Sequence, residues 1–384
     1  MLAGPFCSYQ LATLGADVIK IESPLRPDFM RKTPSVAYFS DRGLSSYYLT
    51  QNANKRSLTL DLQMSVGVEV FHKLVASADV LVENYGNGTL EKLGIGYEAM
   101  SLVNPTLIYC SISGFGSTGD KSDHPAYDTV VQAASGFMDV DREVGGAART
   151  TTVPIIDYST GVYAAMAISA ALLQRSTTGI GQFIDISLMD TALMMMGPIT
   201  TNTLNAGSKA SYGGDIATAT MATYETADGK LVLGAGNHGQ MVRLWRAINQ
   251  PDEAAIVENT TMAQIYDRAD YQRELLVQTL AQYSANHWMP IFHAADVPAE
   301  KVLTIQEALQ QPQIKSRSSL FQTVASPHDP AEKLTLPVSA FSFAHGGPSL
   351  HSPPPDLGQH SEQVLKSVGY NADQINRMRQ EKVI

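Results

Sequence analysis

The stretch "RSLTLDLQMSVGVEVFHKLVASADVLVENY", residues 56–85, decides the fold class. Its two ends, residues 56–62 and 79–85, are short apolar runs of the length and composition of strands. Between them apolar side chains recur at helical spacing, at Val68, Phe71, Leu74 and Val75. A strand, a helix and a strand in this order form the repeating unit of a parallel sheet, so the stretch predicts an α/β protein.

The same alternation continues on both sides of this stretch. Further strands are predicted at residues 16–22, 107–113 and 182–188, and a second helix over Leu90–Val103. Because strands and helices alternate, the economical architecture is an open, Rossmann-like parallel sheet covered by helices. We expect this sheet to form the core of a large domain.

A smaller unit is predicted to interrupt that domain. Residues 205–220, "NAGSKASYGGDIATAT", are rich in Gly, Ser and Ala and indicate a linker or loop. Asp228-Gly229 then predicts a β-hairpin, and helices are expected around 239–248 and 263–284. A late strand within 333–343 and a Pro-rich segment leading into a helix suggest a return to the first sheet. The expected domains are residues 1–205 plus 316–384, and an inserted small α+β domain of residues 206–315.

Composition narrows the function classes. The chain has 384 residues, 44% of them hydrophobic, and a net charge of −10. That acidic balance opposes non-specific binding to nucleic acid or to anionic membranes. Cys7 and Cys110 lack the spacing of metal ligands. The first residues lack the basic region of a signal peptide, and the sequence has no run of 18 uncharged apolar residues of the kind that spans a membrane. We therefore expect buried thiols and a cytoplasmic protein.

A carboxylate stands in an unexpected place in "IIDYSTGVYAAMAISAALLQR", residues 155–175. Asp157 separates an apolar approach from an Ala-rich helical run, where an Asp commonly caps the helix. Ser159 could cap the same helix start, which would leave Asp157 free for chemistry. A carboxylate there can act as a covalent nucleophile, and nearby backbone N–H groups could hold the oxyanion formed by its attack on a carbonyl.

Other motifs give weaker indications. "GFGSTG", residues 114–119, fits the dinucleotide-binding pattern after a strand, but polar, Pro-containing sequence follows it where that pattern needs a helix. A Gly-rich substrate loop or a plain turn is the better interpretation. The nine histidines show no metal-ligand spacing, so no metal site is predicted, and no G-x-S-x-G nucleophile elbow occurs.

Taken together, several stretches resemble the class III CoA-transferase family, of the formyl-CoA transferase and carnitine CoA-transferase type. They occur in the family's order from residue 3 to the C-terminus, and they include "AGPFCSYQLATLGADVIKIE", "NANKRSLTLDL", "LVENYGNGTLEKLG", "SISGFGSTG", "HPAYDTVVQAASG", "IIDYSTGVYAAMAISAALLQR", "GQFIDISLMD", "ADGKLVLGAGN" and "PPPDLGQHSEQVL". The resemblance implies a discontinuous Rossmann-like domain with an inserted small domain, in a homodimer of interlocked chains. It also implies that CoA moves from an acyl-CoA to a small organic acid, with no cofactor beyond coenzyme A itself.

The resemblance assigns roles residue by residue. Asp157 falls at the family's catalytic aspartate, which becomes an aspartyl-CoA thioester. Contacts to CoA would fall at Ala3, Leu60, Asn84, Tyr85 and Lys92. The acyl site would be flanked by Gly114, Gly116, Tyr127, Gly213 and Gly214, where small residues allow closure over a reactive anhydride. Lys55 and Arg56 are expected to supply a local basic patch for the phosphates.

Departures from the family keep alternatives open. Members normally have a strand before "AGP", and this sequence opens at Met1-Leu2, so the first strand of the sheet is expected to be missing. A 2-methylacyl-CoA racemase would carry its histidine base where Tyr127 stands. Because a phenol titrates near 10, Tyr127 is a poor base at neutral pH, and His124, three residues earlier, is the possible replacement. A non-catalytic CoA-binding protein is the third possibility. Asp128 and Gln132 are either pocket residues or a helix cap and a surface amide, and the donor and acceptor acids are left open.

Overall fold

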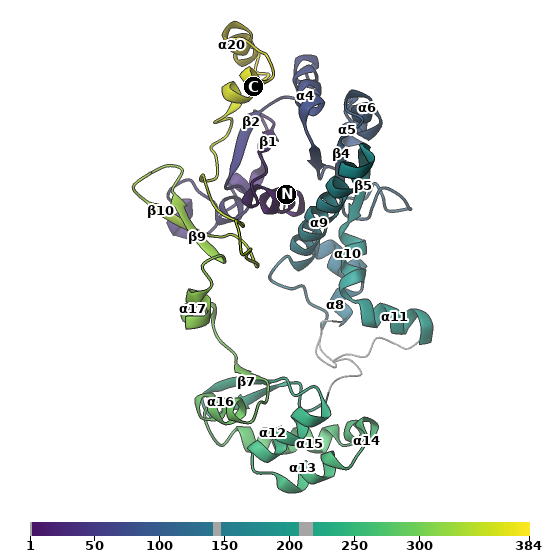
Figure 1. The fold of residues 1–384 in the computed structure, drawn as a ribbon, viewed down its shortest axis with the longest axis vertical. Coiled ribbons are helices and arrows are strands. Elements are labelled where there is room, and N and C mark those ends of the chain that lie inside the picture. Colours follow the sequence, from purple (N-terminus) through teal and green to yellow (C-terminus); the bar gives the residue numbers. More distant parts are fainter. Residues whose placement is uncertain (1, 141–146, 207–217) are drawn as a thin grey trace. The chain divides into compact units, whose positions relative to one another are not determined.

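The computed structural model describes residues 2–140, 147–206 and 218–384 (Figure 1). The chain forms two compact units: Met1–Asp139 with Ala148–Gly197 and Arg317–Ile384, and Val140–Ala147 with Pro198–Ser316. Helix α11, Gly197–Ala206, therefore falls almost wholly in the second unit, whereas the sequence placed residues up to 205 in the large domain.

The first unit holds all five predicted strands, and they are arranged in two parallel sheets. Strand β1, Val18–Glu22, pairs with β2, Lys55–Thr59. Strands β3, Val80–Glu83, β4, Ile108–Ser113, and β5, Gln182–Ser187, form the other sheet in that order. No ladder joins β1 to β3 among the described strands, which corrects the expectation of one continuous sheet. Both strands instead contact helix α1, Ala3–Thr13.

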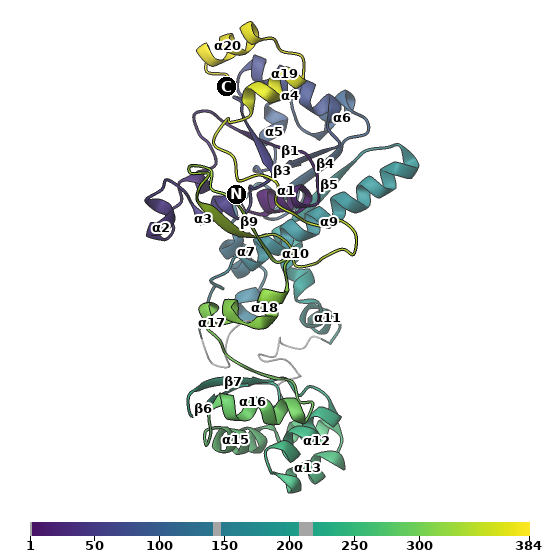
Figure 2. The ribbon, with the colours of Figure 1, turned by 60° about the vertical axis from the view of Figure 1, so that its left-hand side comes forward.

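Helices cover these sheets in Figures 1 and 2. Besides α1 the helices of this unit are α4 Ser65–Ser77, α5 Thr89–Lys92, α6 Tyr97–Val103, α7 Asp128–Ala134, α8 Phe137–Val140, α9 Ile155–Thr178, α10 Leu188–Met195, α19 Ser361–Ser367 and α20 Ala372–Gln380, and not all of them contact a strand. Short turns of helix lie at η1 Phe29–Arg31, α2 Ala37–Ser40 and α3 Ser46–Leu49. The predicted helix over 90–103 is interrupted, because Gly94 has a left-handed φ of +73° that ends α5.

The strand β4 organises the core of this unit. Every residue of β4 is buried, and side chains alternate between its two faces. Tyr109 packs with residues of α4 and α6, while Cys110 and Ile112 pack with α1 and α9. The late strand predicted at 333–343 is β10, Lys333–Pro337, which pairs antiparallel with β9, Phe321–Ala325.

Helix α9 packs closely on α1. A methyl group at Gly161 would lie 2.8 Å from the Ala3 carbonyl oxygen and 3.2 Å from the Cys7 nitrogen, so glycine is what allows this approach. By length and composition α9 is also apolar enough to cross a membrane, and it is the one such helix in the part of the chain that the structure describes. Core helices pass the same test, and Ala164 and Ile168 of α9 are fully buried within the unit.

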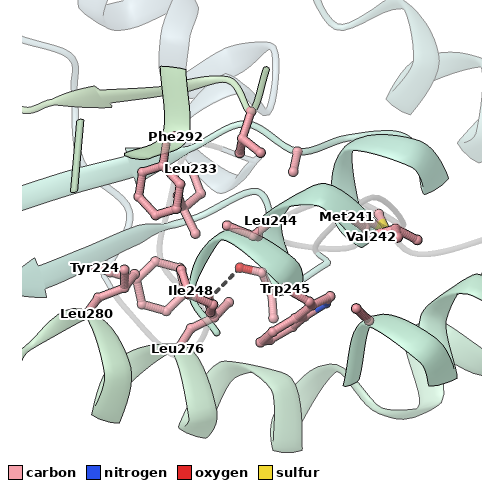
Figure 3. Packing of buried hydrophobic residues seen from close by; sticks show 14 of the residues in the cluster. Tyr224, Leu233, Met241, Val242, Leu244, Trp245, Ile248, Leu276, Leu280 and Phe292 are labelled. Atoms are coloured by element: carbon pink, nitrogen blue, oxygen red, sulfur yellow. Dashed lines mark hydrogen bonds between the residues drawn. The ribbon is translucent and has the colours of Figure 1, made fainter. Parts of the chain in front are cut away.

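The second unit is an α+β assembly with its own core. The predicted hairpin is formed by β6, Thr223–Thr226, and β7, Gly229–Leu233, and β8, Ala299–Lys301, adds a third strand. Its further helices are α12 His238–Ala247, α13 Pro251–Glu258, α14 Met262–Asp267, α15 Ala269–Leu280, α16 Ala285–Ala294, α17 Ile305–Gln310 and α18 Pro312–Ser316. The helix predicted over 263–284 is thus two helices that meet at Arg268. Figure 3 shows Trp245 and Phe292 among the buried side chains of this core.

Candidate active site

Asp157 lies in the first turn of α9 as its third residue, and its side chain is partly buried. The helix begins at Ile155, two residues before Asp157, so Asp157 is inside the helix and does not cap it. Among the described residues, none donates a hydrogen bond to its carboxylate. Burial of a carboxylate without a hydrogen-bond partner lowers the stability of the fold. A residue retained at such a cost is a candidate for a functional role.

The cap of α9 comes from another helix. Asp128, the first residue of α7, accepts hydrogen bonds on Oδ2 from the backbone nitrogens of Ile156 at 2.8 Å and Asp157 at 2.9 Å. Its side chain is 4% exposed. Neither Asp157 nor Ser159 caps α9, although the sequence suggested these residues as caps. The cap is Asp128, which lies 28 residues before Ile156 in the sequence and belongs to a different helix.

Two effects raise the pKa of Asp157. Burial has the larger influence and the neighbouring Asp128 carboxylate adds to it, so that the pKa rises from 3.8 to about 6. The charge of one carboxylate opposes that of the other. Asp157 is therefore mostly ionised at neutral pH, yet it is more basic than an ordinary aspartate.

The first turn of α9 cannot serve as the expected oxyanion site. The nitrogen of Ile155 donates to the Val153 carbonyl at 2.7 Å, and that of Tyr158 donates to Pro154 at 3.1 Å. Asp128 takes the N–H groups of the two residues between them. All four donors at this helix end are occupied, so an oxyanion would need backbone donors from elsewhere.

Aromatic and apolar side chains surround the start of α9. Phe6 of α1 meets the ring of Tyr158 edge-on, with centroids 4.8 Å apart. A shallow apolar depression beside them is lined by Phe6, Tyr158, Ser159, Val162, Tyr163 and Met195.

The residues expected to contact CoA differ in accessibility. Ala3 and Leu60 are buried, at 3% and 1% exposure, so little of either residue is accessible to a ligand. Asn84 follows β3 and lies against Gly4, where a methyl group would be 3.0 Å from the Asn84 amide carbon. Tyr85, 50% exposed, and Lys92, also exposed, present their side chains to solvent.

The expected basic patch is not formed as predicted. Lys55 is buried, and its Nζ donates to the Pro5 carbonyl at 2.8 Å and to Asn52 at 3.2 Å. Burial, the main cause, holds the pKa of Lys55 well below its usual value. Arg56 makes a two-pronged ion pair with Asp17, with nitrogen–oxygen distances of 2.5 and 2.9 Å. Both cations are therefore engaged within the fold.

The Gly-rich segment 114–119 is a loop fixed by residues that the sequence analysis did not single out. Asn87 donates to the Gly116 carbonyl at 2.7 Å, and Asp185 of β5 accepts from the Ser117 nitrogen at 2.9 Å. Gly114 packs so closely that a methyl group would lie 2.3 Å from the Ala126 Cβ. Asn87 sits in "YGNG", a turn signal after a strand that could have drawn attention to it.

The remaining predicted site residues are Tyr127, its alternative His124, and two glycines. Tyr127 occupies the N-cap position of α7, directly before Asp128, and is 60% exposed. The alternative base His124 has a 56% exposed side chain and lies edge-on to Phe115. Gly213 and Gly214 lie outside the described residues.

Comparison with known proteins decides the family. Residues 1–361 match CoA-transferase family III. The chain belongs to this family.

Curated relatives of this family III chain are CoA-transferases that are named for small acids. Succinyl-CoA:glutarate CoA-transferase of Homo sapiens is 32% identical over 96% of this chain and 83% of its own length. Succinate–glutarate CoA-transferase of Agrobacterium fabrum is 34% identical over 95% and 92%. Succinyl-CoA:mesaconate CoA-transferase of Haloarcula hispanica is 31% identical over 96% and 93%.

Solved structures agree with the fold of this family III member. A CaiB/BaiF family protein from Brucella suis superposes with a TM-score of 0.79 at 31% identity, covering 96% of both chains. The protein Rv3272 of Mycobacterium tuberculosis gives 0.81 at 26% identity, over 94% of this chain and 95% of that one. The chain is thus a family III CoA-transferase with a mixed α/β fold containing parallel sheets.

Proposed function

We propose that this family III enzyme moves CoA from an acyl-CoA donor to a small carboxylic acid through an aspartyl-CoA thioester on Asp157. The observation that carries the proposal is the Asp157 carboxylate itself. It is partly buried and has no hydrogen-bond donor among the described residues, and its pKa is raised to about 6. It is ionised at neutral pH but more basic than a free aspartate, which is what a carboxylate nucleophile needs.

The reaction proceeds by two acyl exchanges. An Asp157 oxygen attacks the thioester carbonyl, the C–S bond breaks, and a mixed anhydride and CoA thiolate form. The thiolate then attacks the aspartyl carbonyl, the anhydride C–O bond breaks, and the donor acid leaves. An acceptor carboxylate reverses both steps and departs as its CoA thioester, so Asp157 is regenerated without an external nucleophile.

The substrates are small dicarboxylates, with succinyl-CoA as the donor. This part of the proposal is supported by the relatives, whose names pair succinyl-CoA with glutarate and with mesaconate. The racemase alternative has no support from the structure, because its replacement base His124 is largely exposed and makes no contact with Asp157 among the described interactions.

Chemical trapping tests the covalent step. The protein is incubated with succinyl-CoA and then with hydroxylamine, and its peptides are mapped by mass spectrometry. We expect a hydroxamate on Asp157, since hydroxylamine attacks both the anhydride and the thioester. Asp157→Ala should give none, and Asp190→Ala, which changes an exposed carboxylate in the first turn of α10, should react like the unaltered protein.

The trapping result can also go against the proposal. If succinyl-CoA and other acyl-CoAs leave Asp157 unmodified in a protein that still binds CoA, the nucleophile assignment fails.

We further infer that the enzyme is a homodimer in which α9 contributes to the interface. Val162, Met166 and Leu173 lie on one face of α9 and are 52%, 59% and 71% exposed. Met194 of α10, a helix that contacts α9, is 67% exposed. Apolar side chains gathered in this way mark a protein–protein interface. The interlocking of two chains, which the family resemblance implies, stays a prediction.

A charge on this face should separate the subunits. Met166→Glu is expected to convert a dimer to a monomer in light scattering coupled to gel filtration, because a carboxylate buried in an apolar interface has no partner. Leu102→Glu on α6 is the matched control, since Leu102 is 85% exposed and lies on a different helix. A variant at Met166 that stays dimeric would exclude α9 from the interface.

A further inference from the structure

The nucleophile's helix is held by a carboxylate from a different helix. Asp128 of α7 binds the backbone nitrogens of Ile156 and Asp157 through a single oxygen, at 2.8 and 2.9 Å. Pro154, the residue before α9, offers no side-chain cap. Because Asp128 satisfies the helix end, the side chain of Asp157 has no structural duty at its own helix terminus.

Asp128 is itself held in place from its other side. Its Oδ1 accepts a hydrogen bond from Nε2 of Gln132, one turn along α7, and Gln132 is fully buried. The same Gln132 nitrogen donates to the Thr151 hydroxyl at 2.9 Å, and its Oε1 accepts from the Thr151 backbone at 3.0 Å. These bonds tie α7 to the segment that leads into α9. The position of the first turn of α9 is therefore set by a buried polar network and not by loop sequence alone.

We propose that Asp128 is a positioning residue for the transferase reaction, which fixes the first turn of α9 and thereby the point at which the Asp157 carboxylate meets the thioester. The inference rests on the proposed role of Asp157 as the nucleophile. Both carboxylate oxygens of Asp128 accept hydrogen bonds within the fold, so neither is free to act on the reacting atoms.

A second consequence of this arrangement is electrostatic. The Asp128 carboxylate lies close enough to Asp157 to raise its pKa, in addition to the larger effect of burial. Among the described residues, Asp128 on α7 and Tyr158 on α9 itself are the ionisable groups that interact with Asp157. Removal of the Asp128 charge should therefore lower the pKa of Asp157, whereas loosening Asp128 without removing its charge should affect catalysis and leave that pKa unchanged. The pH profile thus separates the electrostatic effect of Asp128 from its effect on position.

The variant Asp128→Asn tests the proposal, because it keeps the shape of the side chain and removes the charge. We expect kcat to fall about 10²-fold from misplacement of the nucleophile, with a smaller effect on KM. The acid limb of the pH profile of kcat should move to lower pH, since Asp157 then loses its neighbouring negative charge. Gln132→Met, which loosens Asp128 without removing its charge, should lower kcat and leave the acid limb where it is. Asp190→Asn should change neither property.

A stability titration gives a readout that does not require turnover. The melting temperature is measured from pH 4 to 8 for the unaltered protein, Asp128→Asn, Asp157→Asn and the double variant. We expect the pH-dependent loss of stability caused by Asp157 to occur over a narrower and lower range of pH in Asp128→Asn, and to be absent from both variants that lack Asp157.

The outcomes distinguish the two proposals. If Asp128→Asn leaves kcat, the acid limb and the stability titration as they are, the role of Asp128 is overturned while trapping at Asp157 can still succeed. If no hydroxamate forms on Asp157 in the unaltered protein, the proposed function fails, and the positioning role fails with it.

Discussion

Asp157→Asn is expected to abolish CoA transfer and, at the same time, to make the folded protein more stable at neutral pH. An amide cannot attack a thioester as a carboxylate does, so the proposed aspartyl-CoA thioester cannot form. Removal of a covalent nucleophile lowers kcat by about 10⁴-fold or more, and any residual rate comes from binding alone. Steady-state assay with succinyl-CoA and glutarate measures this loss.

The gain in stability follows from the sign of the pKa shift. The folded protein holds the Asp157 proton more tightly than the unfolded chain, with a pKa of about 6 against 3.8. As the pH rises through this interval, the unfolded chain ionises first and the free energy of unfolding falls. The full shift corresponds to about 3 kcal/mol above pH 6, and partial exposure of the carboxylate reduces this to about 2 kcal/mol. Asparagine carries no charge and escapes that cost.

Urea denaturation at two pH values measures the effect. Asp157→Asn should exceed the unaltered protein in unfolding free energy at pH 7.5, and the difference should vanish near pH 4, where the carboxyl of the native protein is protonated. Asp190→Asn, at an exposed position, should show no such pH dependence. Equal stability of Asp157→Asn and the native protein at pH 7.5 would mean that Asp157 is better solvated than the structure indicates.

Strand β4 could be predicted from the sequence because its side chains are buried. In β4 all six residues are buried, so apolar and β-branched residues fill a run that a short window detects. The sequence did not predict a break within a helix where the break depends on the backbone angle of a single residue. Gly94, with φ of +73°, divides the predicted helix over 90–103, yet a single glycine within an apolar pattern is a weak signal. Ladder formation between strands depends on tertiary contacts, so the division into two sheets was not predictable from strand patterns.

Asp157 could be singled out from the sequence as a candidate nucleophile, whereas its environment could not be predicted. Asp157 interrupts an apolar helical pattern, and that anomaly is visible in sequence. Its cap is not visible, because Asp128 reaches it from α7 through a tertiary contact. The same limit explains Lys55, which a motif predicted as a phosphate ligand and which the fold buries against the Pro5 carbonyl. Sequence patterns report local structure, whereas hydrogen-bond partners depend on how elements pack.

Replacement of Gly161 by valine is expected to cause a large loss of stability, because two helix backbones meet there. A Cβ at this position would lie 2.8 Å from the Ala3 carbonyl oxygen and 3.2 Å from the Cys7 nitrogen, and both are backbone atoms that cannot rotate away. Overpacking of this kind costs about 3 kcal/mol or more, since α1 and α9 must move apart. Valine adds a branched side chain to that collision and should prevent α1 from docking on α9.

Gly161→Ala and Gly239→Ala separate this contact from ordinary helix propensity. Alanine stabilises a helix by about 1 kcal/mol relative to glycine. At Gly239 of α12 a methyl group would meet nothing closer than 3.5 Å, so Gly239→Ala should be neutral or stabilising. At Gly161 the collision should outweigh the gain, and Gly161→Ala should lower the free energy of unfolding.

Activity links this packing to the chemistry. Helix α9 carries Asp157 and packs on α1, which begins at Ala3. If the two helices move apart, hydroxylamine should trap Asp157 more slowly in Gly161→Ala, measured under conditions where the variant is still folded. Circular dichroism establishes folding, urea titration measures stability, and trapping measures the nucleophile. If Gly161→Ala matched Gly239→Ala in all three, the close contact between α1 and α9 would not be needed to hold Asp157 in place.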